Sequence, residues 1–317
     1  MIGPGPPLVG SDALGDALQF LRMSGTYYGR SELTSPWGLE LPATEGLLWF
    51  HVLTSGRCRL EVDGTDPLAL EPGDLALVPR GEGHRLRSER GAPTATIDEV
   101  ELEQVGDRYE ILRHGGGGAP ATMVCGAVRF DHPAARNLID VLPRIIHVAA
   151  SAASDADWIH STVRLMAAEV TSPRPGAETV VTRLADILVV QAIRAWIDTD
   201  PAAQTGWLGA LQDRQIGRAI ALIHADPARD WTVASLADEL AMSRSAFAAR
   251  FTQLVGEPAM RYVARWRMNV ARDSLAEEGA TVADVAGRLG YRSEAAFSRA
   301  FKRIVGVSPG AVRAGLA

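Results

Sequence analysis

Four side chains in the first half of the chain are of types that could bind a metal or respond to an oxidant: His51, Cys58, His84 and Cys125. Imidazole nitrogens are common metal ligands, and a thiol can be oxidised reversibly. The chain has two cysteines and no CxxC pair, which excludes a cysteine-built zinc site and a disulfide framework. A metal centre or a redox switch would therefore have to be assembled from side chains that lie far apart in the sequence.

Basic residues near the end of the chain point to a different chemistry. From Trp207 onward there are 15 basic residues, all arginine except Lys302, against 11 acidic ones, whereas the preceding part has 17 basic and 27 acidic residues. Arginine suits two-pronged contacts with phosphate and guanine. The net charge of −6 thus conceals a basic C-terminal part, and this asymmetry fits an acidic partner domain joined to a DNA-binding domain.

An internal repeat organises the basic part. The segment 232–243 recurs at 281–293 with an offset of about 49 residues, and 247–256 recurs at 297–306 with an offset of about 50. The slip of one residue falls between the two segments of each copy, where an insertion in a turn preserves the flanking helices. The repeat predicts two similar helical hairpins, at about 232–254 and 281–304.

Each copy has the residues that a helix-turn-helix motif requires. A small residue, Ala241 or Gly290, lies where the two helices must approach closely. Phenylalanines at positions i and i+4 are expected to anchor the second helix and leave its opposite face free for the major groove. Residues that can cap the helix N-termini precede all four helices: Thr232, Ser243, Thr281 and Ser293.

These residues resemble the AraC/XylS family of bacterial regulators. The signature Gly290–Pro309 (GYRSEAAFSRAFKRIVGVSP) is similar to the family's second motif, and the resemblance covers about residues 212–313. It implies a transcription regulator, whether activator or repressor, in which two recognition helices enter successive major-groove segments of double-stranded DNA, about one helical turn apart. It also implies RNA polymerase as a partner.

The resemblance marks positions on each recognition helix for DNA contact. We expect Arg299 to contact a base, and Glu294 to accept from cytosine or to orient an arginine. Arg250, Lys302 and Arg303 are expected at phosphates. Because alanines offer little beyond contact with a thymine methyl group, the second half-site should carry the stronger sequence requirement. The expected DNA-contact residues are Arg244, Ser245, Ala248, Ala249, Arg250, Glu294, Ala295, Ser298, Arg299, Lys302 and Arg303.

A long helix, 261–275, is expected between the two motifs. Its predicted core stripe consists of Tyr262, Trp266, Val270 and Leu275. Four arginines, at positions 261, 265, 267 and 272, decorate the remaining surface. Whether they pair with acids or with phosphates stays open at this point.

The region from about residue 11 to 130 reads as a series of short strands separated by turns such as Asp63-Gly64. The segment Gly73–His84 (GDLALVPRGEGH) resembles the second motif of the cupins, which implies a cupin-like β-barrel. The metal-binding part of the first cupin motif is missing, since Trp49 stands where the glutamate would fall. His84 aligns with a ligand position and His51 is an uncertain second, so we predict no bound metal or cofactor.

The N-terminal region also resembles the cupin-type sensor domain of a subgroup of these regulators. Some members of that subgroup respond to reactive chlorine species through cysteine oxidation, which makes Cys58 and Cys125 candidate sensor residues beside His51 and His84. The alternative is that both cysteines are small buried apolar residues.

The expected architecture is a two-domain α+β protein. We predict a cupin-like sensor and dimerisation domain at 11–197, a linker at 198–211 and an all-α DNA-binding domain at 212–317. Amphipathic helices are expected at 158–168 and 182–196, and the second is a candidate homodimer surface. No apolar run is long enough for a membrane helix and no signal peptide is recognisable, so we expect a cytoplasmic protein.

The predicted function is that of a sequence-specific transcription regulator without enzymatic activity. Its cupin domain would sense an unknown small molecule or oxidant and control DNA binding or polymerase recruitment. The competing prediction is a metal-dependent cupin enzyme, of oxygenase or isomerase type, with an appended DNA-binding domain. Metal content separates the two.

Overall fold

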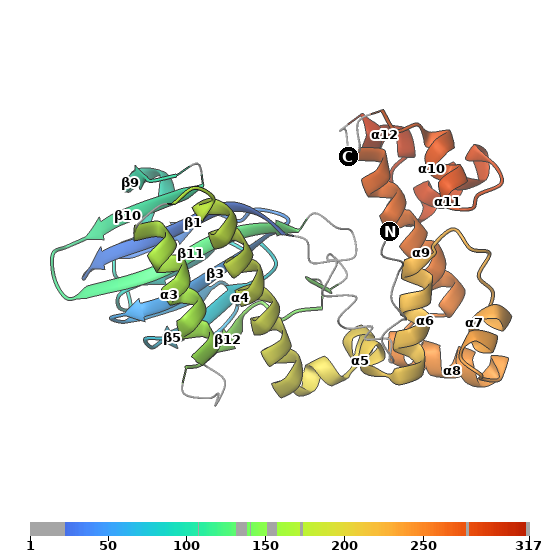
Figure 1. The fold of residues 1–317 in the computed structure, drawn as a ribbon, viewed down its shortest axis with the longest axis horizontal. Coiled ribbons are helices and arrows are strands. Elements are labelled where there is room, and N and C mark those ends of the chain that lie inside the picture. The colour runs from blue at the N-terminus through green and yellow to red at the C-terminus, as the bar shows by residue number, and fades with distance from the viewer. Residues whose placement is uncertain are drawn as a thin grey trace. The chain divides into compact units, whose positions relative to one another are not determined.

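The computed structural model describes residues 23–106, 108–130, 138–139, 141–150, 157–171, 174–276 and 279–314 (Figure 1). The chain divides into two compact units. One consists of Arg22–Asp131 and Ile139–Thr199 and contains all the described strands, and the other contains the helical segment Asp200–Ala317. We call these the N-terminal unit and the C-terminal unit. This is the predicted two-domain α+β architecture.

The described strands of the N-terminal unit form two sheets, and among them no closed barrel is formed. The neighbours β1 and β10 are parallel, as are β2 and β8, whereas the other pairs are antiparallel. A short 3₁₀ helix, η1 (Ile97–Glu99), precedes β9. In spatial order the first sheet consists of β12 (Ile146–Val148), β6 (Leu75–Val78), β3 (Leu47–Ser55), β11 (Pro120–Phe130), β1 (Met23–Thr34), β10 (Tyr109–Gly115) and β9 (Glu101–Gln104), and the second of β5 (Leu68–Leu70), β4 (Cys58–Val62), β7 (His84–Arg87), β2 (Gly38–Leu41) and β8 (Ala95–Thr96).

The centre of the larger sheet is buried on both faces. On β3, Trp49 and Leu53 pack with residues of the smaller sheet in one hydrophobic core, whereas Phe50 and Val52 point to the other face and are buried as well. Side chains of a strand alternate between the faces, so a strand covered on both sides is hydrophobic throughout. This explains the unbroken apolar run from Leu47 to Leu53.

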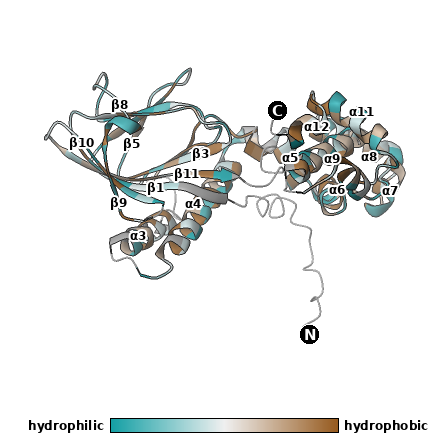
Figure 2. Cartoon of the chain, turned by 90° about the horizontal axis from the view of Figure 1, so that it is seen from above, coloured by the Kyte–Doolittle hydropathy of each residue, from teal (hydrophilic) through white to brown (hydrophobic). Residues whose placement is uncertain are grey.

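Two helices of the same unit accompany the larger sheet: α3 (Asp157–Thr171) and α4 (Ala177–Thr199). They contain the segments predicted as helical, and α4 contacts β1, β6 and β12 (Figure 1). Leu188 and Ile193 of α4 are buried, whereas Ile187 of the same helix is 48% exposed. Figure 2 shows hydrophilic and hydrophobic residues intermixed on both helices. Within the described part of the chain, no helix has the length and apolar character to span a bilayer.

The C-terminal unit begins earlier than the predicted linker would allow. Residues 198–211 include the 3₁₀ helix η2 (Pro201–Gln204) and most of α5 (Gly206–Gln212), whose Trp207 and Leu208 are buried. The apolar residues of this breaker-rich segment find a core to pack against, which its composition does not reveal. The predicted start at residue 11 lies outside the described residues. The helices that follow are α6 (Arg214–Ala225), α7 (Val233–Glu239), α8 (Arg244–Val255), α9 (Ala259–Ala276), α10 (Val282–Arg288), α11 (Glu294–Val305) and α12 (Pro309–Arg313).

Both helix-turn-helix motifs turn through one residue in the left-handed backbone region. Ala241 has φ 52° between α7 and α8, and Gly290 has φ 75° between α10 and α11. Among the described residues, Ala241 is the one non-glycine residue with a positive φ. A Cβ at Gly290 would lie 2.4 Å from the carbonyl oxygen of Ala228, in the loop before α7. The second turn therefore needs glycine for conformation and for space, whereas the first carries the strain of an alanine.

This difference predicts opposite effects of two reciprocal substitutions. Ala241→Gly should raise the free energy of unfolding by about 0.5–1 kcal/mol, because relief of left-handed strain exceeds the entropy that glycine adds to the unfolded chain. Gly290→Ala should lower it by about 2 kcal/mol or more, because strain and the clash with Ala228 add. Urea denaturation of the full chain measures both. Effects of the same sign would contradict this account of the turns.

Candidate nucleic-acid interface

The second helix of each motif, α8 or α11, starts and ends in the same way. The hydroxyl of Ser243 accepts a hydrogen bond from the amide of Ala246 at 3.2 Å, and Ser293 and Ala296 repeat this contact at 3.2 Å. Both helices end at a left-handed glycine, Gly256 or Gly306. Thr232 and Thr281 cap the preceding helices. Each of the four predicted capping residues thus accepts a hydrogen bond from one of the free backbone amides in the first turn of its helix.

Phenylalanine pairs fasten both helices to the core of the unit. Phe247 and Phe251 of α8, and Phe297 and Phe301 of α11, are all fully buried. The ring centroids lie 5.6 Å apart within each pair. Because residues four apart lie on one face of a helix, the opposite face of α8 and of α11 is left to solvent.

The free face of α11 carries charged side chains that no described residue neutralises. Glu294, Arg299 and Lys302 are exposed. None of their side chains makes a hydrogen bond or an ion pair with another residue that the structure describes. Ala295 and Arg303 are also exposed, and Ser298 is half-buried. Glu294 therefore does not orient an arginine here, and Arg299 is free to meet a base edge or a phosphate.

The free face of α8 offers less. Arg244, Ser245 and Ala249 are exposed, and Ala248 is half-buried. Arg244 is the one charged residue among these four, and it has no ionic partner among the described residues. Arg250, which we expected at a phosphate, instead donates to the carboxylate of Asp213 at 2.5 Å. Its positive charge is therefore partly compensated within the protein.

The partner of Arg250 also caps a helix. Asp213 accepts hydrogen bonds from the first amides of α6, at Gln215 and Ile216. Partial burial would raise the pKa of Asp213, but the hydrogen bonds from Arg250 and the two amides outweigh this effect and lower it. The carboxylate stays ionised and connects α8 to the start of α6. Sequence reasoning missed this contact because 37 positions separate Asp213 from Arg250.

The arginines of α9, whose partners the sequence left open, are mostly engaged within the protein. Arg261 and Arg265 pair with Glu257, the latter at 2.6 Å. Arg267 donates to the carbonyl oxygens of Pro227 and Arg229 at 2.7 and 2.8 Å. The long helix thus uses these arginines to hold neighbouring turns. Its predicted core residues are buried, except Val270, which is half-buried.

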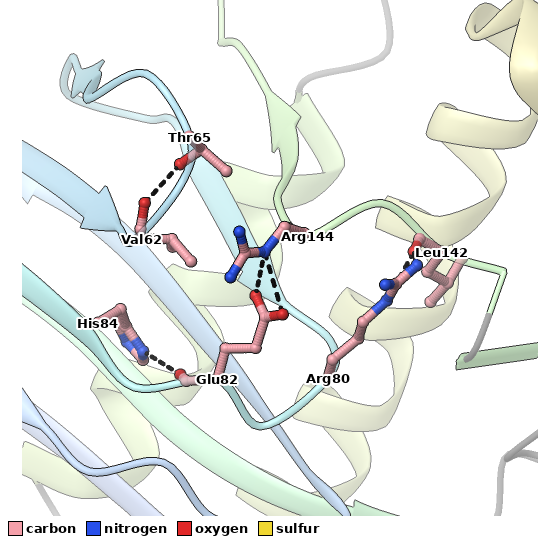
Figure 3. A network of polar contacts seen from close by, with 7 residues as sticks. All are labelled: Val62, Thr65, Arg80, Glu82, His84, Leu142 and Arg144. Atoms are coloured by element: carbon pink, nitrogen blue, oxygen red, sulfur yellow. Dashed lines mark hydrogen bonds and ion pairs between the residues drawn. The ribbon is translucent and has the colours of Figure 1, made fainter.

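In the N-terminal unit, the structure brings His51 and His84 into direct contact. His51 lies on β3 and His84 on β7, in different sheets, and their Nε2 atoms are 2.8 Å apart. Nδ1 of His84 lies 3.0 Å from the carbonyl oxygen of Glu82 and must donate to it, as Figure 3 shows. Nε2 of His84 is then the acceptor of a proton on Nε2 of His51, so hydrogen bonding assigns both tautomers.

One ion pair and one side-chain contact with a backbone carbonyl fix the loop that carries Glu82. Nε of Arg144 bonds both carboxylate oxygens of Glu82, at 2.8 and 3.0 Å, and Arg80 donates twice to the carbonyl of Leu142 (Figure 3). The segment 142–144 therefore holds the loop between β6 and β7 in place. Through the Glu82 carbonyl, this loop orients His84.

The histidine pair is enclosed by the core. His51 is fully buried and His84 is 3% exposed, with Trp49 stacked on His51 at 6.3 Å. Burial lowers the pKa of His84 to about 4 and holds that of His51 well below its usual value. Both rings are therefore neutral at physiological pH. Among the described residues no cluster of three or more His, Cys, Asp or Glu side chains could hold a metal ion, so these two nitrogens have no third ligand there.

The two cysteines face the same core as the histidines. Cys125 lies opposite His51 in the β11–β3 ladder, and Cys58 lies on β4; both are free thiols. Burial raises the pKa of Cys125 to about 12, and burial followed by the nearby Cys125 raises the pKa of Cys58. Since the thiolate is the reactive form, an oxidant would have to open the sandwich before either sulfur could react. A redox role for them stays a prediction.

Family models match both units. A cupin model matches residues 12–198, and a helix-turn-helix domain model matches residues 236–315. The first covers more than half of the chain. The matches agree with the two sheets of the N-terminal unit and with the paired motifs of the C-terminal unit.

Similarity to known proteins extends over nearly the whole chain. A putative AraC-like transcription regulator of Streptomyces lividans is 36% identical over 95% of this chain and 98% of its own. The transcriptional regulator AlkR of Acinetobacter baylyi is 29% identical over 94% of this chain and 97% of its own. The RCS-specific transcriptional activator RclR of Escherichia coli is 27% identical, over 95% and 97% respectively.

The histidine pair predicts that acid destabilises the N-terminal unit. In the unfolded chain both histidines take up a proton near their ordinary pKa of 6.5, whereas the folded-state pKa is about 4 for His84 and well below 6.5 for His51. The stability that the neutral pair contributes is complete above pH 6.5 and is lost as the pH falls toward 4. The loss approaches about 1.4 kcal/mol per pH unit for each histidine. Urea unfolding followed by tryptophan fluorescence measures it.

A double substitution provides the control. His51→Leu with His84→Leu removes both titrating groups, keeps the site apolar and should flatten the pH dependence between 6.5 and 4. His114→Gln, on β10 and outside the pair, should leave the slope as in the parent protein. An unchanged slope in the double variant would show that other groups cause the acid sensitivity.

Proposed function

Because the chain belongs to the AraC-like family of DNA-binding transcription regulators, with a cupin domain before the helix-turn-helix domain, we propose that it reads a specific DNA operator under the control of a signal. In this proposal α8 and α11 enter successive segments of the major groove. The cupin domain senses a small molecule and thereby changes DNA binding or the recruitment of RNA polymerase.

The difference in free charge between the two recognition helices carries the proposal. Arg299 and Lys302 of α11 are exposed and have no partner among the described residues, whereas on α8 Arg244 alone is free, because Arg250 is paired with Asp213. A free guanidinium on a groove-facing helix suits the two acceptors of guanine. We therefore assign base discrimination mainly to α11 and positioning mainly to α8.

The control step requires a signal that distinguishes two arrangements of the protein. A ligand shifts such an equilibrium only by its difference in affinity for the two states. A small molecule is favoured over an oxidant, because Cys58 and Cys125 are buried and their pKa values are raised. The name of RclR states an RCS-specific response for that protein, and oxidation is the alternative for this chain.

We also propose that the regulator forms a homodimer through α4. Val180 and Ile187 of this helix are 41% and 48% exposed, and Leu184, between them on the same face, is half-buried. The spacing of four and three residues places them in one stripe. α4 packs against its own unit on one side and carries this exposed apolar stripe on the other. Such a stripe suits contact with the same helix of a second copy.

Substitutions on α11 should separate base reading from phosphate binding. Arg299→Ala should cost about 1–3 kcal/mol of discrimination at one base pair of the second half-site. Lys302→Ala should weaken all sequences alike and reduce the slope of log affinity against log salt by about one. Binding to a library of operator variants at several salt concentrations measures both effects.

The first half-site supplies the comparison. Ala249→Ser, a substitution at an exposed position of α8, should change the preference at any single base pair far less than Arg299→Ala does. Base changes within the half-site of α8 should also be tolerated better than changes within that of α11. Equal sequence requirements at the two half-sites would refute the assignment.

The dimer surface can be tested through its charge. Val180→Glu combined with Ile187→Glu should convert the dimer to a monomer, because two carboxylates would have to be desolvated at the interface. Thr179→Glu, at an exposed neighbouring position, serves as the matched control and should leave the mass unchanged. Light scattering at micromolar concentration measures the mass. A parent protein that is already monomeric would overturn the proposed dimer.

A further inference from the structure

A groove lies between α3 and the face of the larger sheet that points away from the smaller one. Its volume is about 830 Å³, which falls within the range of small-molecule sites. It is separate from the histidine pair, because Val52 and Val124 line it from the opposite side of the strands that carry His51 and Cys125. All the residues that line it belong to the N-terminal unit.

The inner wall of the groove is apolar. Val52 on β3 and Val124 on β11 are direct partners in the strand ladder, so their side chains lie together on this face. Ile159 and Val163, one turn apart on α3, complete the lining and are 0% and 7% exposed. Because Val52 and Val124 are also only 1% and 4% exposed, these aliphatic side chains form the floor of the groove, against which the apolar part of a ligand can rest. They cannot solvate a charge.

The charged groups of the groove are both positive. Arg30 on β1 and Arg164 on α3 line it, and none of the described lining residues is Asp or Glu. Nη2 of Arg30 pairs with Glu32 at 3.0 Å, but Glu32 also accepts from Arg113, and Nε of Arg30 is buried without a hydrogen-bond partner. Among the residues that the structure describes, the one contact of the Arg164 guanidinium is a long one of 3.5 Å, with the hydroxyl of Ser161.

Hydroxyl groups add neutral hydrogen-bonding capacity beside the arginines. Thr54, Ser55, Thr122 and Ser161 all line the groove. A guanidinium matches a planar carboxylate with two parallel hydrogen bonds, and this match strengthens in a partly desolvated setting. An apolar wall with cationic and hydroxyl groups nearby therefore favours an organic anion over a neutral or cationic molecule of the same shape.

We propose that this groove is the ligand site of the N-terminal unit and that it takes an organic anion with a compact apolar body, such as an aromatic carboxylate. The inference rests on the proposed sensing function, since it names the class of signal. The apolar body rests on the floor of the groove, at Val124 and Val163. The carboxylate meets Arg164 and Arg30.

Calorimetry with 2-naphthoate and the neutral analogue 2-naphthalenemethanol, on the full chain, tests the site. We expect one naphthoate per chain and an affinity at least about tenfold higher than that of the alcohol, a ratio equivalent to about 1.4 kcal/mol. Equal affinities for the two compounds, or no naphthoate binding at millimolar concentration, would overturn the proposal.

Three variants locate the binding. Arg30→Gln combined with Arg164→Gln should reduce naphthoate affinity at least about tenfold and leave the weak binding of the alcohol unchanged. Ser161→Trp should abolish binding of both compounds by filling the groove, and it keeps the arginines in place should the double variant fail to fold. Arg183→Gln, on α4 and outside the groove, also replaces an arginine by glutamine, removes one positive charge and should bind as the parent protein does. Undiminished binding in Ser161→Trp would place the ligand elsewhere.

Operator binding measured in the same samples separates this inference from the proposed function. Loss of the groove proposal with intact, sequence-specific DNA binding would leave the regulator assignment standing and require another signal site. Naphthoate bound in the groove with no effect on operator affinity or transcription would confirm the site and overturn its role in control.

Discussion

The N-terminal unit depends on a single constraint: the centre of its larger sheet is covered on both faces. Neighbouring residues of β3 and β11 must then satisfy two different surroundings, because alternate side chains point to opposite sides. His51 and Cys125 point toward the smaller sheet and the shared core, whereas Val52 and Val124 point toward α3 and the groove. A shift of one residue in the register would exchange these sets, so the hydrophobic pattern also determines which residues line the groove.

The same constraint explains the neutral histidine pair. A buried imidazole is tolerated when it is uncharged and hydrogen-bonded, and the two rings share one such bond at 2.8 Å. Which ring nitrogen of each histidine carries the proton depends on the carbonyl of Glu82. It therefore also depends on the loop that Arg144 and Arg80 hold in place. The two histidines that resemble a fragment of a metal site by sequence lie in direct contact in the folded chain and connect the two sheets.

The C-terminal unit meets a different constraint twice. Each motif must reverse the chain within a few residues and still leave one helix face free, and each does so with a left-handed residue, serine caps and buried phenylalanines. The two copies share their turns, caps and buried phenylalanines, and they differ in the charged side chains that they leave unpaired. In the first, Asp213 takes up Arg250, whereas the charged residues of α11 lack such a partner among those described. Equal scaffolds thus present unequal surfaces to DNA.

The sequence by itself determined the frame of this protein. The repeat with its caps and phenylalanines predicted both motifs, because local capping geometry follows from residue type. The resemblance of Gly73–His84 to a cupin motif implied the cupin fold, which the family model matches. Only the tertiary structure decided which charges are free. The pairing of Arg250 with Asp213, the contact of His51 with His84, the helix within the expected linker and the groove beside Arg30 and Arg164 all join segments distant in the chain. Such contacts depend on how elements pack, and no local pattern encodes the partner.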